Sequence, residues 1–214
     1  MKEIIGKILP RSFYLNETLT VARGLLGCIL VVNDCPNAIS QIDGGRVSIQ
    51  LRTGIAAGRI VETEGYLGHA DSACHSYNKK PGGRTNIMFG EGGYAYIYFI
   101  YGMYYCLNTV TREEGEPQGV LIRALEPLGE GINTKAYSGP GKLCRELNIT
   151  KDDYGTDLTK NSRLFILKPD DYQTPDIGSS IRIGVQNSGA GATLPYRFYQ
   201  RGNKSVSGRL SMRQ

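Results

Sequence analysis

Apolar and polar residues alternate along several short segments of the chain, which is the periodicity of half-buried β-strands. The clearest case is residues 94–100, Tyr-Ala-Tyr-Ile-Tyr-Phe-Ile, and a second strand-like run covers residues 104–110. Two strands separated by so few residues form a β-hairpin. The pattern therefore predicts a hairpin whose tip lies near Tyr101 to Met103.

Other segments predict more strands and two helices. Strands are expected at residues 28–32, 46–51, 56–66, 119–127, 163–167, 180–185 and 196–200. Helices are expected at residues 16–27, capped by Asn16 or Thr18, and at residues 138–149, with Ser138 or Pro140 near the start. Strands follow strands without regular helical crossovers, so the pattern indicates an α+β fold with an antiparallel sheet.

Composition narrows the class of protein. The 214 residues are 40% hydrophobic and 21% charged, which is typical of a globular protein, and residues 1–214 are expected to form one domain. The 28 glycines indicate many tight turns. The five cysteines are scattered and never form a CxxC motif, which favours reduced thiols in an intracellular protein over disulfides or a zinc site. No signal peptide and no apolar run of the ~18 residues that a membrane helix needs are expected.

Positive charge is concentrated at the C-terminal end. The net charge is +5, and the segment after Leu194 carries five cations and no acid: Arg197, Arg201, Lys204, Arg209 and Arg213. Such a run is compatible with a polyanionic partner or with a solvated terminus, and we expect residues 203–214 to form a flexible basic tail.

Candidate chemistry begins with residues 59–68, RIVETEGYLG. Alternate residues of a strand share a face, so Glu62, Glu64 and Tyr66 should point the same way. Arg123 is a lone cation in the apolar run VLIRAL, and a buried arginine needs an anionic partner. A Glu64–Arg123 pair could activate water. The alternatives are a purely structural ion pair or a solvated strand face.

Fewer conclusions follow from the histidines, the lysines and the tyrosines. His69 and His75 lack a second histidine at metal-ligand spacing. Lys142, near a predicted helix start, could meet a phosphate or be solvated. Stacked tyrosines such as Tyr96 and Tyr98 could pack a core, bind a sugar or stack on a nucleobase. An aromatic side chain at a hairpin tip resembles the wedge of DNA-bending proteins, although tip aromatics also occur in protein–protein contacts.

Taken together and in order, the strings RIVETEGYLG, MFGEGGYAYIYFIYGMYYCLN, GVLIRALEP, SGPGKLC and YRFYQRG resemble the alkyladenine (3-methyladenine) DNA glycosylase family of the mammalian type. The resemblance spans residues 13–203. It implies a single α+β domain with a curved antiparallel sheet. It also implies a monomer that binds duplex DNA containing a damaged purine, flips that nucleotide and hydrolyses its N-glycosidic bond without a metal or cofactor. The bases implied include 3-methyladenine, 7-methylguanine, hypoxanthine and ethenoadenine.

The resemblance also implies roles for individual residues. Glu64 corresponds to the general base and Arg123 to its partner in holding the attacking water. A base pocket is implied for five residues: Tyr66, His75, Tyr96, Tyr98 and Asn108. Tyr101 corresponds to the side chain inserted into DNA, with Met103 beside it, and the DNA backbone contacts are expected from Arg84, Lys142 and Arg201.

Two features qualify these implications. Glu91 and Tyr94 precede the hairpin, where a carboxylate could repel phosphate or brace the loop. No lysine is placed as an obvious Schiff-base nucleophile, which indicates a glycosylase without strand cleavage.

From the residues alone, two alternatives remain: a glycoside hydrolase that uses Glu62 and Glu64, and a catalytically inactive DNA-bending protein. No membrane partner is expected, and the chain would lie with the DNA, in a bacterial cytoplasm or a nucleus.

Overall fold

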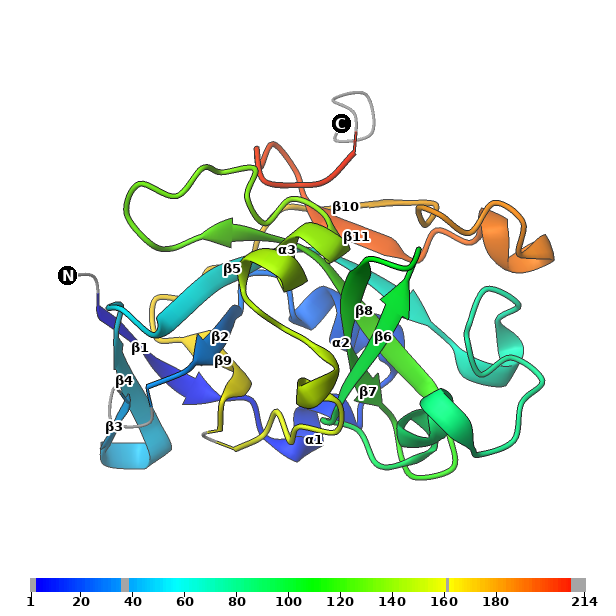
Figure 1. Ribbon diagram of the computed structural model, residues 1–214, viewed down its shortest axis with the longest axis horizontal. Coiled ribbons are helices and arrows are strands. Elements are labelled where there is room, and N and C mark those ends of the chain that lie inside the picture. Colours follow the sequence, from blue (N-terminus) through cyan, green and yellow to red (C-terminus); the bar gives the residue numbers. More distant parts are fainter. Residues whose placement is uncertain (1–2, 36–38, 161, 209–214) are drawn as a thin grey trace.

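One large antiparallel sheet organises the computed structural model, which describes residues 3–35, 39–160 and 162–208. The main path of the sheet runs in the order β3-β4-β1-β9-β2-β5-β8-β7-β6, while β11 joins at β5 and carries β10 (Figure 1). The strands are β1 Glu3–Ile8, β2 Ile29–Asn33, β3 Ile39–Ile42, β4 Arg46–Gln50, β5 Ile55–Tyr66, β6 Ala95–Ile100, β7 Tyr104–Thr111, β8 Gln118–Pro127, β9 Leu164–Pro169, β10 Ile177–Ser180 and β11 Arg197–Gln200. This confirms the predicted α+β class.

Short helices pack on the sheet and fill its connections. The α-helices are α1 Arg11–Tyr14, α2 Thr18–Gly24 and α3 Pro140–Glu146, and the 3₁₀ turns are η2 Asp43–Gly45, η3 Gly68–Ala70, η4 Gly83–Phe89, η5 Lys151–Asp153 and η6 Gly189–Thr193. Helix α2 packs against β5 and β8, and α3 packs against β7 and β8. Their buried side chains join those of the central strands in the main hydrophobic core.

The start of α2 differs from the prediction. Neither expected cap residue caps the helix: Asn16 donates instead to the carbonyls of Ser12 and Phe13. The hydroxyl of Thr18 is buried and forms hydrogen bonds with the side chains of Thr111 on β7 and Gln118 on β8. Tertiary partners therefore replaced the local capping bond, and they fix α2 to β7 and β8. Pro140, by contrast, does lie in the first turn of α3.

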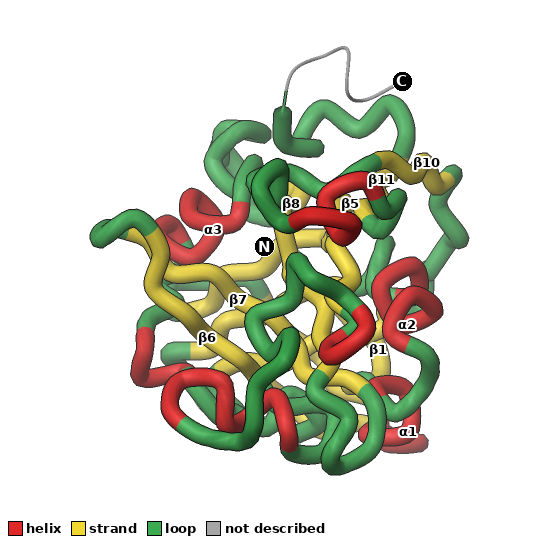
Figure 2. The backbone as a smooth tube through the Cα atoms, turned by 90° about the vertical axis from the view of Figure 1, so that its right-hand side faces the viewer, coloured by secondary structure: helices red, strands yellow, loops and turns green. Residues whose placement is uncertain are grey.

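The predicted hairpin is present and projects from the body of the molecule (Figure 2). Its strands β6 and β7 pair from Ala95 with Thr109 to Ile100 with Tyr104. Alternation along β6 assigns two faces. Ile97 is buried in the main core, while Tyr96 and Tyr98 join a smaller aromatic cluster on the other side.

The loop before this hairpin is braced by an ion pair. Glu91 lies 3.4 Å from the Nε of Arg11, and the guanidinium of Arg11 stacks on the ring of Tyr94 at 4.5 Å. Arg11 also pairs with Asp157. Of the two effects that a carboxylate could have here, the structure therefore shows the bracing one.

The strand predicted at residues 180–185 was wrong. Strand β10 ends at Ser180, and residues 181–188 form a loop. Arg182 turns into the protein, where it binds Asp71 and the carbonyl of Gly191, and the backbone N–H of Ile183 donates to Glu64 rather than to a strand. Side-chain hydrogen bonds thus replace sheet pairing in this segment.

The C-terminal end also differs from the expected basic tail. Arg197 is buried in β11, and within residues 203–208 Ser205, Val206 and Ser207 are buried as well. Val206 packs with Val61 and neighbouring apolar side chains. The rest of the expected tail, residues 209–214, lies outside the described residues.

Candidate active site

The centre of the site is an irregular stretch of β5. Its pairing with β8 shifts register between Ile60 and Glu62 and again between Glu62 and Thr63. Such bulges bend a strand and redirect its side chains. Glu62 and Glu64 both reach Arg123 on β8: Nε of Arg123 lies 3.1 Å from Glu62 Oε1, and Nη1 lies 3.2 Å from Glu64 Oε2. The arginine is therefore shared by two carboxylates rather than held by one.

Glu64 is fully buried and has three hydrogen-bond donors. Besides Nη1 of Arg123, the hydroxyl of Tyr66 donates to Oε2 at 2.8 Å and the backbone N–H of Ile183 donates to Oε1 at 2.7 Å. Tyr66, Arg123 and Ile183 all line the adjoining cavity. The carboxylate of Glu64 thus lies directly behind the cavity wall.

Glu62 is also fully buried, but most of its partners come from the other side. Its Oε1 accepts from Nε of Arg197 at 2.7 Å and from the hydroxyl of Ser207 at 2.9 Å. Its Oε2 accepts from the backbone N–H of Ser207 at 2.7 Å. Neither carboxylate lies on a solvated strand face, and Glu62 is held as the anion of a buried ion cluster.

The two carboxyl groups are shifted in opposite directions. Burial pushes the pKa of Glu62 upward, but the charges of Arg123 and Arg197 outweigh it, so this pKa lies below its usual range. Burial also raises the pKa of Glu64, and there Arg123 and the two hydrogen-bond donors offset it only in part, so the pKa stays above its usual range. Two carboxyl groups with diverging pKa values can take different roles.

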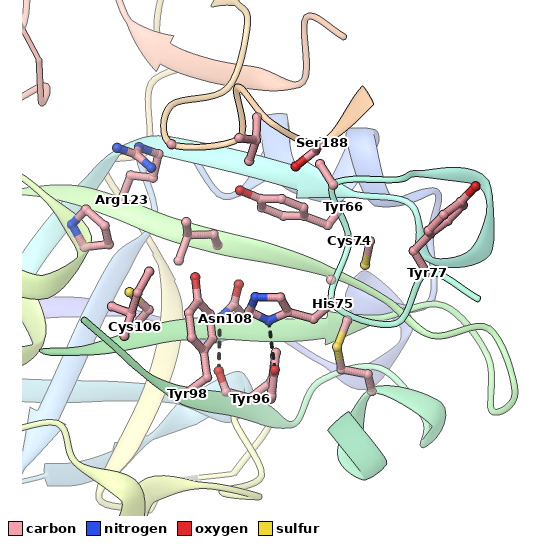
Figure 3. A pocket seen from close by; sticks show the side chains of 18 of the residues that line it. Tyr66, Cys74, His75, Tyr77, Tyr96, Tyr98, Cys106, Asn108, Arg123 and Ser188 are labelled. Carbon is pink, nitrogen blue, oxygen red and sulfur yellow. Dashed lines mark hydrogen bonds between the residues drawn. The ribbon is translucent and has the colours of Figure 1, made fainter. Parts of the chain in front are cut away.

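A cavity of about 580 Å³ opens beside these groups. Figure 3 shows the ring of Tyr66 on one side and the side chains of His75 and Tyr98 on the other, with Arg123 toward one end. The rings of His75 and Tyr98 pack edge to face, with centroids 4.5 Å apart. The gap between these aromatic side chains suits a flat ligand.

Polar contacts hold one wall of the cavity. Nδ1 of His75 and the hydroxyl of Tyr96 lie within hydrogen-bond distance at 3.0 Å, and the side-chain amide of Asn108 donates to the carbonyl of Tyr96 (Figure 3). Burial, with the nearby cations Arg84 and Lys79, lowers the pKa of His75 to about 4. The imidazole is therefore neutral at pH 7.

All five residues predicted for a base pocket, namely Tyr66, His75, Tyr96, Tyr98 and Asn108, line this cavity. Tyr101 at the hairpin tip lies at its rim, with 78% of its surface exposed, and Met103 is exposed beside it. Both Tyr101 and Gly102 have positive φ, 54° and 67°, as in a type I′ turn. The left-handed region is unfavourable for a bulky residue such as tyrosine.

The three cations predicted to meet a DNA backbone do not lie together. Arg84 is exposed in η4, close enough to His75 to depress the pKa of that imidazole, and Lys142 is exposed on α3 beside the cavity-lining Gly141. Arg201 lies in a separate groove after β11 and pairs with Asp176. Lys79, which the sequence reasoning did not select, is exposed at the cavity.

Sequence reasoning also missed the support of the loop at residues 181–188. Arg182 and Asp71 form a completely buried ion pair, and Arg182 stacks on Tyr66 at 4.6 Å from the ring centroid. The pair connects this loop to the segment that carries His75. One available indication was Arg182 itself, a lone arginine between isoleucines in SIRIGV, comparable to Arg123 in VLIRAL.

The described ranges contain no group of three or more His, Cys, Asp or Glu side chains that could hold a metal ion. The cysteines are all free thiols. Over the same ranges, no helix is long and apolar enough to cross a membrane.

Comparison with known proteins gives the family. The sequence profile described as methylpurine-DNA glycosylase matches residues 12–204, almost the whole chain. The chain belongs to the methylpurine-DNA glycosylase family. A relative from Methanocella arvoryzae, named "Putative 3-methyladenine DNA glycosylase", is 42% identical over 213 residues, which cover 94% of this chain and 96% of the relative. Relatives with the same name from Bdellovibrio bacteriovorus and Clostridium botulinum are each 39% identical and cover 94% of this chain and 98% of their own.

Proposed function

We propose that this protein is a monofunctional 3-methyladenine DNA glycosylase. It removes alkylated and deaminated purines from duplex DNA by hydrolysing the N-glycosidic bond, and it thereby starts base excision repair. The expected bases are 3-methyladenine, 7-methylguanine, hypoxanthine and ethenoadenine. The observation that carries the proposal is the aromatic-walled cavity, which ends at Arg123 with the carboxylate of Glu64 directly behind it.

The chemistry of the cavity favours an alkylated purine over an ordinary one. A purine alkylated at N3 or N7 carries positive charge, and the faces of Tyr66 and Tyr98 attract a cation through their π electrons. A protonated imidazole would repel such a base, but His75, with a pKa of about 4, is neutral. Selection is helped further because a damaged base costs less to unpair, by a few kcal/mol.

In the proposed reaction, Glu64 acts as the general base. A water molecule attacks C1′ of the sugar, its proton passes to the Glu64 carboxylate, and the electron pair of the C1′–N bond leaves with the purine. A raised pKa makes Glu64 a stronger base than an ordinary carboxylate. Arg123 orients the water: its Nη2 makes no hydrogen bond with the described residues, and the side chain lines the cavity.

Water must gain access to Glu64, because that side chain is fully buried. In this proposal the hydrogen bond from the Tyr66 hydroxyl to Glu64 breaks, because the hydroxyl belongs to the ring on which the base stacks. Displacing this ring slightly would expose Oε2 beside Arg123. The position of Tyr66 would thus couple base binding to activation of the water.

The hairpin tip supports the proposed extrusion of a nucleotide. Tyr101 is largely exposed and is held in a left-handed conformation that costs about 1–2 kcal/mol for a residue other than glycine. An aromatic side chain in such a position can fill the gap that an extruded base leaves in the stack. Met103 would lie beside it. Lys79 lines the cavity, Arg84 lies near His75, and Lys142 follows the cavity-lining Gly141, so these cations would meet the passing phosphates. Arg201, in its separate groove, would meet phosphates farther away.

Two other functions agree less well with the positions of the carboxylates and of the lysine at the cavity. A glycoside hydrolase would need two working carboxylates that flank a bond. Glu62 and Glu64 share one strand, and Glu62 is saturated with hydrogen bonds behind the wall. Strand cleavage through a Schiff base requires an activated lysine, usually one that is desolvated. Lys79 is exposed, so we expect borohydride to trap no covalent adduct with DNA.

The proposal is tested with duplexes that carry one 3-methyladenine, 7-methylguanine, hypoxanthine or ethenoadenine, and with an undamaged duplex as the control. Free base and abasic DNA should appear from the damaged duplexes, with strand breaks only after alkali. If the wild-type chain binds these duplexes but releases no base, it is a DNA-bending protein and the proposal is wrong.

The proposed wedge is tested by Tyr101→Asn. Asparagine tolerates the left-handed turn better than tyrosine, so the hairpin should remain folded while the aromatic wedge is lost. Excision from duplex DNA should slow, with the thermal unfolding temperature unchanged or raised. Ile132→Ala is the matched control, since Ile132 is also an exposed apolar residue but does not line the cavity. Equal excision by Tyr101→Asn and wild type would exclude the wedge.

A further inference from the structure

A residue just beyond the family match reaches Glu62, the carboxylate that shares Arg123 with Glu64. The family profile ends at residue 204, yet Ser207 contributes two hydrogen bonds to Glu62, one from its backbone N–H and one from its hydroxyl. The same carboxylate accepts from Nε of Arg197 and from Nε of Arg123. Ser207 is therefore two hydrogen bonds away from the arginine of the proposed active site.

Packing fixes the segment that carries Ser207. The hydroxyl of Ser205 donates to the carbonyl of Thr134, and the hydroxyl of Ser138 donates to the carbonyl of Val206. The side chain of Val206 is fully buried. In Figure 1 this part of the chain, in red, follows β11 and runs along the upper edge of the molecule. The Ser138 hydrogen bond and the buried side chain of Val206, both adjacent to Ser207, hold Ser207 against β5.

We propose that Ser207 and Arg197 are positioning residues that act through Glu62 to set the orientation of Arg123. This inference rests on the proposed function, because it concerns the guanidinium that holds the attacking water. Glu62 is the anchor of the arrangement, and the C-terminal segment makes that anchor rigid.

The geometry at Arg123 explains why an anchor is needed. Nε binds Glu62, Nη1 binds Glu64, and Nη2 remains for the cavity. A guanidinium prefers two parallel hydrogen bonds to one carboxylate. If Glu62 did not hold Nε, the group could rotate and grip Glu64 with two nitrogens. Nη2 would then bind Glu64 and would no longer face the water.

The donors to Glu62 suit this role. Arg197 supplies charge, and its side chain stacks on Tyr199 at 4.8 Å, which restrains it. Ser207 supplies two neutral donors at fixed angles, one of them from the backbone. The depressed pKa of Glu62 agrees with a carboxylate that stays ionised while Glu64 takes up a proton.

The test compares two serines of the same segment. Ser207→Ala removes the hydroxyl that binds Glu62. Ser205→Ala removes a hydroxyl that is also buried and that, among the described residues, binds the Thr134 carbonyl alone. Single-turnover excision of hypoxanthine and of 7-methylguanine from duplex DNA is measured with saturating protein from pH 5 to 9. Affinity for the same duplexes and urea unfolding are measured in parallel.

Ser207→Ala should slow excision about 10-fold with unchanged DNA affinity, because a small displacement of a catalytic group can cost up to ~100-fold. The acid limb of its pH–rate profile should move to lower pH, because an Arg123 side chain that Glu62 holds less firmly binds Glu64 more closely and favours its ionised form. Ser205→Ala should stay within about 2-fold of wild type.

The outcomes separate the two proposals. If wild type excises bases but both serine variants match it in rate and pH profile, the positioning role is wrong and the segment only stabilises the fold. An equal rate loss in both variants, in proportion to lost stability, overturns it as well. If wild type releases no base from any duplex, the proposed function fails and this inference fails with it.

Discussion

Glu62 and Glu64 lie two residues apart on β5, both are completely buried, and both bind Arg123. Their surroundings nevertheless differ. Arg197 and Ser207 surround Glu62 with donors on the C-terminal side, whereas Glu64 has one charged partner and lies behind the wall of the cavity. The pKa of Glu62 is lowered and that of Glu64 is raised.

The difference shows that burial alone does not decide what a carboxylate does. Desolvation raises both pKa values, and it is the largest cause at each residue. At Glu62 the charges of Arg123 and Arg197, with hydrogen bonds from Arg197 and from the backbone N–H of Ser207, outweigh desolvation. Glu62 is therefore suited to hold charge and Glu64 to exchange a proton.

The largest expected effect comes from Glu64→Gln. Excision should slow by about 10²- to 10⁴-fold, since the general base is lost. The duplex should still bind. Single-turnover rates and affinities measured together check this. A variant that keeps even a tenth of the wild-type rate would show that Glu64 is not the base.

Glu62→Gln should lower stability and, because Glu62 also anchors Arg123, slow excision. It removes the anion that pairs with both Arg197 and Arg123, and breaking a buried ion pair costs about 3–5 kcal/mol. Urea unfolding at pH 7 should show a larger loss than for Glu64→Gln. The comparison between the two residues fails if Glu64→Gln proves the more destabilising substitution.

The pH dependence of stability should separate the two carboxylates. Glu62 has a lowered pKa in the folded state, so its contribution is present above its unfolded pKa of ~4.3 and is lost as pH falls through the folded value. The deficit of Glu62→Gln should therefore shrink in acid. Glu64 has a raised pKa, so its ionisation costs stability as pH rises through the folded value.

Relative to wild type, Glu64→Gln should thus gain stability as pH rises from the unfolded pKa of ~4.3 toward the raised pKa of Glu64. Unfolding free energies of the three proteins, measured at several pH values, check both trends. Parallel curves for the two variants would contradict the assignment of opposite pKa shifts.

The smallest expected effect comes from Tyr66→Phe. The substitution keeps the ring but removes the hydroxyl that donates to Glu64. That hydrogen bond lowers the pKa of Glu64, so its loss should raise this pKa further. The acid limb of the excision rate should move to higher pH by about one unit or less, which corresponds to about 1.4 kcal/mol. Tyr77→Phe, at the edge of the same cavity, serves as the control.

Local patterns were sufficient for elements with regular alternation. The β6–β7 hairpin was predicted from the alternation along residues 94–100 and its short turn, and strand β8 was predicted from its apolar run. The segment at residues 180–185 shows the same alternation, yet it forms a loop since Arg182 binds Asp71 far away in the sequence. The predicted cap of α2 was wrong for the same reason, because the Thr18 hydroxyl binds Thr111, which is distant in the sequence.

For the site, the sequence placed Glu62, Glu64 and Tyr66 on one strand face and suggested Arg123 as a partner. It could not show that the two carboxylates share this arginine, because the double register shift in β5 brings them to it. Nor could it show that Arg197 and Ser207 complete the cluster, since they lie about 135 and 145 positions from Glu62.

The sequence by itself therefore determined the sheet-rich class, the hairpin with its tyrosine tip and the chemical groups of the site. These depend on periodicity and residue type, which are local properties. Only the tertiary structure decided which carboxylate is held as a permanent anion and which lies behind the cavity. That division depends on the charges and hydrogen-bond donors that folding brings together from distant segments. They meet in a buried region, where the low dielectric strengthens each electrostatic interaction.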